Sequence, residues 1–443
     1  MQKLDRRGIT ISAIAGLVTG LVLAWVIWRE TAPPREVAVQ SPPTAARTPD
    51  AAPAGPATDG APAAEATAAA NEPAAPAKLN PADVDLAKAR EVDGHLVQEL
   101  GPGREVTFTV MPTVQATATS IMRKAEVSFG AVVAMDPHTG RILALAEHSS
   151  ADPSIQHLAL KANPPAASVF KLITTVALLE SAGLTPDQSV CYHGGLHGLT
   201  ERHLVDDPKR DTACQTMTEA LGHSTNAVYG KLAHKFLTAP VLQKVATAFG
   251  WERDLPFLYP VEPSRAVFSD DRVKLAKTAA GFYDTHLSPL HAALVAGALA
   301  NDGLMMAPQL VERFTVGGKL IQELAPAPIG RSCEERTART LARMMVTTTE
   351  TGTAGPYFRK RGKSLEGIRV AGKTGSLSAE GMDGQQNHFS WWVGFAPAEN
   401  PRIALAAVVV NVGTWRIKGT YLAREVLESY FEAVEKVTLT SVH

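Results

Sequence analysis

The sequence lacks any long run of basic residues and carries almost no net charge. Its 443 residues contain 43 Lys and Arg against 44 Asp and Glu, a formal net charge of −1. Such a balance offers no electrostatic footprint for a polyanion, which argues against nucleic acid as a partner. No internal repeat is evident, and 45% of the residues are hydrophobic, enough for a sizeable core in one or two domains. The function must therefore be sought in particular sites.

One stretch near the N-terminus contains no charge at all. Residues 8–28 are apolar or small throughout, and these 21 residues would form a helix of about 32 Å, long enough to cross a bilayer core. A cleaved signal peptide is the alternative, but Trp25, Trp28 and Arg29 stand where a small-residue cleavage site would be expected. Basic residues within 1–7 precede the span, so the positive-inside rule places this tail in the cytoplasm and the bulk of the chain in the periplasm or otherwise outside the membrane.

Residues 29–80 have almost no large apolar side chains. Positions 31–80 contain 18 Ala and 10 Pro, so this segment cannot bury enough surface to offset its ordering entropy. We expect a disordered tether. Residues 81–128 then combine one short helical pattern with a β-branched stretch at 104–114, which we interpret as a small stalk before a domain at 129–443.

Short apolar runs at both ends of the remaining chain predict strands. Residues 130–135 and 141–146 flank the turn Asp136-Pro-His-Thr-Gly140, where Pro fixes φ and Gly accepts a positive value, and so predict a hairpin. Three further strand-like runs lie at 368–375, 389–395 and 403–411. About 200 residues of helical pattern separate the two groups. We therefore expect an α+β fold with one antiparallel sheet of about five strands, completed by distant segments and flanked by helices.

A Ser-x-x-Lys motif opens the first long helical pattern. Ser168 follows two prolines and precedes an apolar run, so it could simply be the first residue of a helix. Positions three apart on a helix are neighbours, however, which places the amine of Lys171 against the Ser168 hydroxyl. A lysine with the ordinary pKa of about 10.4 is a poor base at neutral pH, so activation requires burial and a second cation nearby. The spacing alone does not distinguish these interpretations.

Two further motifs could complete such a site. Ser224-Thr-Asn226 interrupts a helical stretch, so a loop can present both polar side chains; a helix cap is the alternative. Lys373-Thr-Gly375 ends a predicted strand, and Gly375 has no side chain, which permits a substrate backbone to lie antiparallel along the strand edge. A plain strand end with an exposed lysine is the alternative there.

Together the three motifs resemble the Ser-x-x-Lys, Ser-x-Asn and Lys-Thr-Gly set of penicillin-binding proteins, whose serine acyltransferase superfamily includes the serine β-lactamases. Each occurs once, in the family's order, and the resemblance covers residues 130 to 436 approximately. Other matching segments lie at 136–140, 287–293, 299–303, 352–354 and 391–397. The resemblance implies an all-helical subdomain beside the sheet, no cofactor and no metal. It also implies a D,D-transpeptidase that cross-links peptidoglycan stem peptides ending in D-Ala-D-Ala.

The same resemblance assigns a role to each motif residue. Ser168 would attack the carbonyl between the two terminal D-alanines and form an acyl-enzyme, while Lys171 takes its proton. Ser224 would relay a proton to the leaving amine. Asn226 would hold Lys171 and the substrate amide, and Lys373 would be the second cation.

Substrate binding is implied in the same way. Thr374 and Ser376 would bind the terminal carboxylate, and the backbone N–H groups of Ser168 and Ser376 would form an oxyanion hole. β-Lactams would mimic the dipeptide and trap Ser168. Ala166 and Ala167 stand where many relatives have Gly-Ser, and Ser376 where Thr is common, but the small residues and the hydroxyl are retained. No glycosyltransferase region is found, so a separate membrane glycosyltransferase is the expected partner.

Three alternative functions stay open. A D,D-carboxypeptidase differs only in using water to resolve the acyl-enzyme, and no motif decides between the two; the N-terminal span and tether favour the transpeptidase. A β-lactamase needs a deacylation device, but a Glu-x-x-x-Asn loop is absent and Asn226 argues against a carbamylated lysine. A non-catalytic β-lactam sensor or scaffold is disfavoured by the intact motifs.

The three cysteines all lie in the part expected outside the membrane. Cys191 and Cys214 are 23 positions apart, and because thiols oxidise there we predict a disulfide between them, with a contribution of about 3 kcal/mol. A zinc site is the alternative, although its spacing matches no common zinc pattern. Its ligands would come from Cys191, His193, His197, His203 and Cys214. Cys333 would remain a free thiol.

Overall fold

The computed structural model describes residues 78–196, 198–282, 285–323, 325–380 and 385–440. The predicted membrane span at 8–28 and nearly all of the tether at 29–80 lie outside these ranges. Within the described residues, no helix combines the length and the apolar character needed to cross a bilayer.

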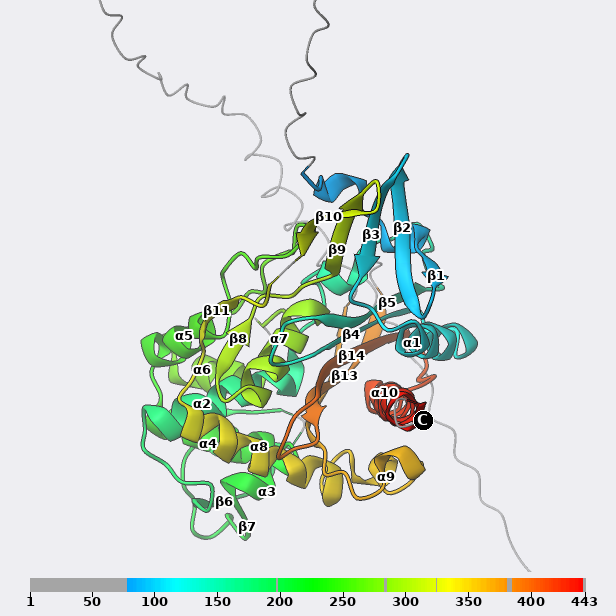
Figure 1. Cartoon of the computed structure of the whole chain (residues 1–443). Coiled ribbons are helices and arrows are strands. Elements are labelled where there is room, and N and C mark those ends of the chain that lie inside the picture. Colours follow the sequence, from blue (N-terminus) through cyan, green and yellow to red (C-terminus); the bar gives the residue numbers. More distant parts are fainter. Residues whose placement is uncertain (1–77, 197, 283–284, 324, 381–384, 441–443) are drawn as a thin grey trace, which may run out of the picture. The chain divides into compact units, whose positions relative to one another are not determined.

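A five-stranded antiparallel sheet forms the centre of the described chain (Figure 1). Its strands, in spatial order, are β12 (Ala371–Glu380), β13 (Gln386–Ala396), β14 (Ile403–Val412), β4 (Phe129–Met135) and β5 (Ile142–Ser149). The strands β4 and β5 form the predicted hairpin, and β14 pairs with β4, with Ala404 opposite Met135. Segments from both ends of the domain therefore complete one sheet, which confirms the predicted α+β fold.

Alternate residues of these strands belong to two separate hydrophobic clusters, one on each face of the sheet. Val133 and Val393 pack in the cluster that contains helix α7 (Pro289–Ala300). Val132 and Trp392 pack in the cluster that contains helix α10 (Gly419–Thr440). Because both faces are covered, the strands appear in the sequence as continuous apolar runs rather than as alternating patterns.

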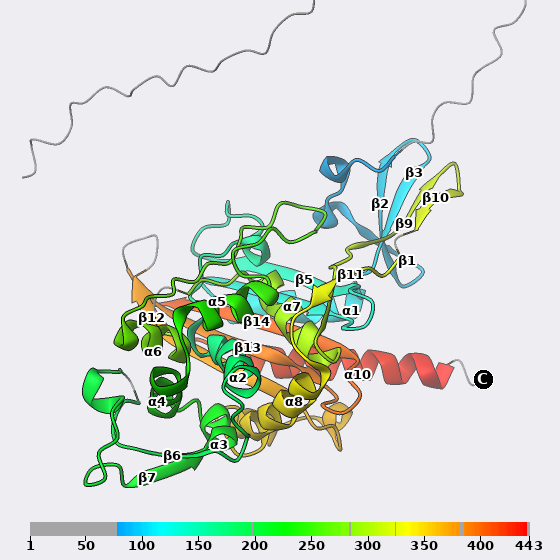
Figure 2. The same ribbon diagram turned by 90° about the vertical axis from the view of Figure 1, so that its left-hand side faces the viewer.

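Further helices extend the layer on the α7 side, and Figure 2 shows them grouped together. They are α2 (Lys171–Glu180), α3 (Met217–Gly222), α4 (Asn226–Phe236), α5 (Ala239–Ala248), α6 (Arg272–Ala280) and α8 (Glu335–Glu350). The short α9 (Gly355–Phe358) is not among them, because its Phe358 belongs to the cluster that contains α10. Two small two-stranded sheets accompany them, β6 (Ser189–Tyr192) with β7 (Ala213–Thr216), and β8 (Leu304–Met306) with β11 (Pro328–Arg331).

A second five-stranded sheet contains residues from the expected stalk. Its order is β1 (Arg90–Val92), β2 (His95–Gly101), β3 (Arg104–Phe108), β9 (Val311–Val316) and β10 (Lys319–Glu323). The β-branched stretch at 104–114 is not one strand, because Pro112 begins helix α1 (Pro112–Lys124) and Pro is favoured at the first position of a helix. Helix α1 packs against β5 and α10.

The sequence predicted that the Lys-Thr-Gly motif ends a strand, but the structure places it inside β12. Pairing with β13 is uninterrupted from Ala371, opposite Phe395, to Glu380, opposite Gln386. Among the described strands β12 pairs only with β13, so its other edge is unpaired along the motif. This edge is the feature of the fold that positions the site.

Candidate active site

Three segments far apart in the sequence meet at the beginning of α2. A 3-10 helix, η4 (Ala167–Phe170), carries Ser168 and leads directly into α2, which begins at Lys171. Ser224 lies in the turn between α3 and α4, and Asn226 is the first residue of α4. Lys373 lies on the edge strand β12. The structure thus brings together all five residues that the motifs single out.

The amine of Lys171 lies within hydrogen-bonding distance of three oxygen atoms. They are Ser168 Oγ at 2.8 Å, Asn226 Oδ1 at 2.6 Å and the Ala280 carbonyl at 2.6 Å. The last two are carbonyl oxygens, which only accept hydrogen bonds. A neutral amine would donate its two hydrogens to them and direct its lone pair at the Ser168 hydroxyl. This geometry suits a base that takes the serine proton.

Burial of both lysines makes such a neutral amine available. The side chains of Lys171 and Lys373 are fully buried. Burial, and then repulsion by Lys373, holds the pKa of Lys171 well below its ordinary value. Burial also lowers the pKa of Lys373 to about 7. The structure thus supplies the burial and the second cation that the sequence argument required.

Ser224 is held against Lys373 by an unusual backbone. Lys373 Nζ donates to Ser224 Oγ at 2.8 Å and to the Thr374 carbonyl at 2.7 Å. The φ angle of Ser224 is +59°, in the left-handed region that non-glycine residues rarely occupy and that recurs at functional sites. The cap position of α4 belongs to Thr225, so Ser224 is not a helix cap.

Close packing fixes the turn that carries the nucleophile. Ala167 has a φ of +48°, and the bare Cα of Gly281 lies against it: a Cβ there would stand 2.0 Å from the Ala167 carbonyl oxygen. On the other side, a Cβ on Gly375 would stand 3.2 Å from Val169 Cγ2. The missing side chain of Gly375 therefore admits the nucleophile turn, a contact that the sequence did not indicate.

The remaining motif residues lie along the unpaired edge of β12. Thr374 is half-buried and Ser376 is exposed. Thr374 Oγ1 lies 2.6 Å from the hydroxyl of Thr353, whose single hydrogen can be donated either to Thr374 or to the Gly222 carbonyl at 3.3 Å. Thr353 was not among the predicted site residues, although the segment 352–354 belongs to the family resemblance and could have indicated it. No side-chain pattern could have indicated the Ala280 carbonyl.

The family model of the penicillin binding protein transpeptidase domain matches residues 130–431. The chain belongs to this family. The resemblance drawn from the three motifs is thereby confirmed.

Several named proteins are similar to this chain. It is 28% identical over 377 residues to the peptidoglycan D,D-transpeptidase PbpA of Mycolicibacterium smegmatis. The matched region covers 77% of this chain and 74% of that protein. Stage V sporulation protein D of Bacillus subtilis is 26% identical over 72% of this chain and 52% of its own length. Among solved structures, PBPA of Mycobacterium tuberculosis has a TM-score of 0.61 at 26% identity, over 74% of this chain and 80% of that one.

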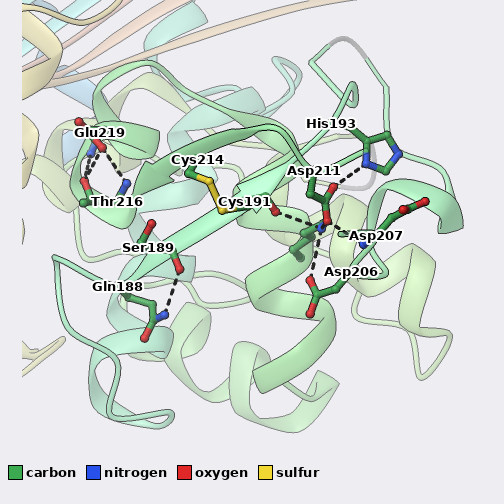
Figure 3. The surroundings of a disulfide bond; sticks show 11 residues. Gln188, Ser189, Cys191, His193, Asp206, Asp207, Asp211, Cys214, Thr216 and Glu219 are labelled. Carbon is green, nitrogen blue, oxygen red and sulfur yellow. Dashed lines mark hydrogen bonds and ion pairs between the residues drawn. A yellow bond between two sulfur atoms is a disulfide. The ribbon is translucent and has the colours of Figure 1, made fainter. Parts of the chain in front are cut away.

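The transpeptidase domain also contains a disulfide beside α4. Cys191 and Cys214 are bonded and lie directly opposite each other in the β6–β7 pair (Figure 3). Cys333 is a buried free thiol. No group of three or more possible metal ligands gathers among the residues that the structure describes; His197, one of the proposed zinc ligands, lies outside them.

Proposed function

We propose that the chain is a peptidoglycan D,D-transpeptidase that forms its acyl-enzyme on Ser168. The observation that carries this proposal is the contact between the Ser168 hydroxyl and Lys171, a buried amine whose other two partners are carbonyl oxygens. The relatives support it: several are named peptidoglycan D,D-transpeptidases. PBPA of M. tuberculosis is known as acyl-enzyme complexes with penicillin G and imipenem.

The contacts support a two-step acyl transfer. Ser168 Oγ bonds to the carbonyl carbon of the penultimate D-alanine while its proton passes to Lys171. The C–N bond then breaks, and the leaving amine receives a proton through the Ser224 hydroxyl, which Lys373 contacts at 2.8 Å. D-Alanine departs. The amine of a second stem peptide attacks the ester, releases Ser168 and forms the cross-link.

The unpaired edge of β12 would bind the donor peptide. The terminal carboxylate would accept hydrogen bonds from the hydroxyls of Thr374 and Ser376, with Thr353 orienting the first of them, and Lys373 would add positive potential. The N–H groups of Ser168 and Ser376 would stabilise the tetrahedral oxyanion. A β-lactam, with its strained amide and carboxylate, would occupy the same positions and acylate Ser168.

Labelling with fluorescent penicillin tests the acylation step. We expect the wild type to be labelled covalently and Ser168→Ala not to be labelled. Ser181→Ala, an exposed serine at the end of α2, is the matched control and should be labelled like the wild type. Equal labelling of Ser168→Ala would refute the assignment of the nucleophile.

Release of D-alanine from a pentapeptide, with and without an amine acceptor, tests the second step. A transpeptidase should convert donor and acceptor into a cross-linked product. Release of D-alanine by hydrolysis alone, unchanged by the acceptor, would identify a D,D-carboxypeptidase instead. Rapid turnover of the penicillin itself would identify a β-lactamase.

We further propose that residues 8–28 anchor the chain with its N-terminus inside, that 29–80 are the tether, and that a separate membrane glycosyltransferase supplies the glycan strands. The uncharged span and the basic residues before it support the anchor. The full chain should remain in membranes after a high-salt wash, and protease added to spheroplasts should digest the domain. Release of the full chain by salt, or protection from that protease, would contradict the topology.

A further inference from the structure

A buried ionic cluster lies beside the active site, outside the residues that contact the reacting groups. We call it the Lys231 cluster; it consists of Lys231, Asp211 and His193. Lys231 Nζ donates to Asp211 Oδ2 at 2.5 Å, and His193 Nδ1 lies 2.6 Å from Asp211 Oδ1. Only 4% of the Lys231 side chain and 6% of the Asp211 side chain are exposed, so this ion pair is shielded from solvent.

The Asp211 carboxyl of this cluster is ionised. Burial alone would raise the pKa of the Asp211 carboxyl, but hydrogen bonds from His193 and Lys231 outweigh this effect and hold that pKa below its ordinary value. Removing one partner of a buried ion pair leaves the other charge uncompensated and is costly. The cluster is therefore a rigid attachment between the segments that carry its members.

Those segments lead directly to the catalytic asparagine. Lys231 lies on α4, whose first residue is Asn226. His193 immediately follows β6, and three residues later the Leu196 carbonyl accepts a hydrogen bond from Asn226 Nδ2 at 2.6 Å. Lys231 also donates to the Cys191 carbonyl at 3.1 Å. The segment 191–196 is thus attached to α4 at three points: the Cys191 carbonyl, His193 through Asp211, and the Leu196 carbonyl. Figure 3 shows His193 and Asp211 next to the strand that carries Cys191.

The turn between His193 and Leu196 has little room to shift. Gly195 has a φ of +67°, and a Cβ there would stand 3.0 Å from the Cβ of Ala227, the second residue of α4. The backbone of this turn lies on the first turn of α4. A displacement of His193 would therefore be transmitted to the Leu196 carbonyl.

The Leu196 carbonyl decides which end of the Asn226 amide faces Lys171. A carbonyl only accepts, so it selects the NH₂ end and leaves Oδ1 for Lys171. If Leu196 withdrew, the amide could turn over and present a donor to a donor. Lys171 would then lose one of the two acceptors that direct its lone pair at Ser168.

We infer that Lys231, Asp211 and His193 are positioning residues for acylation, acting through the Leu196 carbonyl on Asn226. The inference rests on the proposed acyltransferase function. None of the three contacts the reacting atoms. Their effect should appear in the rate of the chemical step rather than in the binding of the β-lactam.

Acylation kinetics with fluorescent penicillin test the inference. Observed rates at increasing penicillin concentration separate the binding constant from the rate of bond formation. Asp211→Asn removes the carboxylate charge opposite Lys231, and its NH₂ group can face His193 only if that ring moves its proton to Nε2; we expect the bond-forming rate to fall by about tenfold to a hundredfold with binding unchanged. Asp206→Asn is the matched control: Asp206 also contacts Lys231, at 3.3 Å, but its side chain is 71% exposed, and its loss should change neither value.

The number of acylated molecules is measured in the same experiment. If Asp211→Asn lowers only this number, and the molecules that react do so at the wild-type rate, the cluster is merely structural and the inference is wrong. His193→Phe keeps the Lys231–Asp211 pair and serves where Asp211→Asn does not fold. It should lower the bond-forming rate, by less than Asp211→Asn; a wild-type rate in this variant also overturns the inference.

Hydrogen exchange separates a failure of this inference from a failure of the proposed function. In Asp211→Asn, and not in Asp206→Asn, peptides containing Leu196 and Asn226 should exchange faster. This result would support the coupling even if penicillin did not acylate the wild type, which would refute the proposed function alone. Unchanged exchange at both peptides would refute the coupling whatever the acylation shows.

Discussion

Replacing Gly281 by alanine tests how the nucleophile turn is held. Gly281 ends α6 with a φ of +84°, and Gly183, which follows α2, has a φ of +64°. Alanine in this left-handed region costs about 1–2 kcal/mol at either position. At Gly183 the added Cβ would meet nothing within 4 Å, so the strain is the whole cost and Gly183→Ala is a matched control.

At Gly281 the added Cβ meets the active site. It would stand 2.0 Å from the Ala167 carbonyl oxygen and 3.0 Å from the Ser168 nitrogen. An ordinary C···O contact is about 3.3 Å, so the Ala167–Ser168 peptide or the end of α6 must move by about 1 Å. Overpacking of this kind adds about 1–3 kcal/mol, for a total loss of about 2–5 kcal/mol. A 1 Å displacement of a reacting group costs about a hundredfold in rate.

The rate of acylation by fluorescent penicillin, determined for the molecules that react, measures this effect independently of unfolding. We expect Gly183→Ala to react at the wild-type rate and Gly281→Ala to react about a hundredfold more slowly. Urea unfolding should show the larger stability loss in Gly281→Ala. If the two variants acylate equally fast, the close contact between α6 and the nucleophile turn does not position Ser168, and the reasoning fails.

Three further outcomes are expected. Replacing Cys191 and Cys214 by serine should lower the free energy of unfolding by about 3 kcal/mol, and reductant should destabilise the wild type equally but not the variant; a reductant-insensitive wild type contradicts this. The pKa of Lys373 falls to about 7 on folding, so above that pH the unfolded chain binds more protons and the free energy of unfolding rises toward about pH 10. The urea midpoint of Lys373→Met should rise less with pH than that of the wild type, and an equal rise in both would contradict this prediction. Thr353→Val removes the hydroxyl 2.6 Å from the motif threonine and should weaken β-lactam binding in the same kinetic assay, while exposed Thr351→Val should not; equal binding constants would exclude this role.

Local patterns predicted much of the fold because they reflect local causes. The hairpin turn at Asp136 needs only a proline and a glycine at suitable positions, and the periodic helices from 168 to 347 need only neighbours three and four residues apart. The loop at Ser224 was likewise visible as an interruption of such a pattern. The ends of β12 could not be predicted from a local pattern, because a strand continues for as long as its partner pairs with it, and that partner is β13.

Long-range pairing was beyond the reach of these patterns. Strand β3 gains β9 as a neighbour, with Val106 opposite Phe314, and nothing near residue 106 indicates a partner two hundred positions away. The contact of Gly375 with the nucleophile turn was not visible in the sequence for the same reason. Its Cα faces Val169, and this contact exists only after the sheet and the nucleophile helix have packed together.

The sequence by itself determined the chemical groups of this protein: a serine, an amine three residues later, and the Ser-x-Asn and Lys-Thr-Gly motifs that identify its family. Only the tertiary structure decided their state. Lys171 is a candidate base because packing removes it from water, sets Lys373 nearby, and places the Asn226 and Ala280 carbonyl oxygens where they direct its lone pair at Ser168. Desolvation and hydrogen-bond direction are properties of surroundings assembled from distant segments, and no single segment contains them.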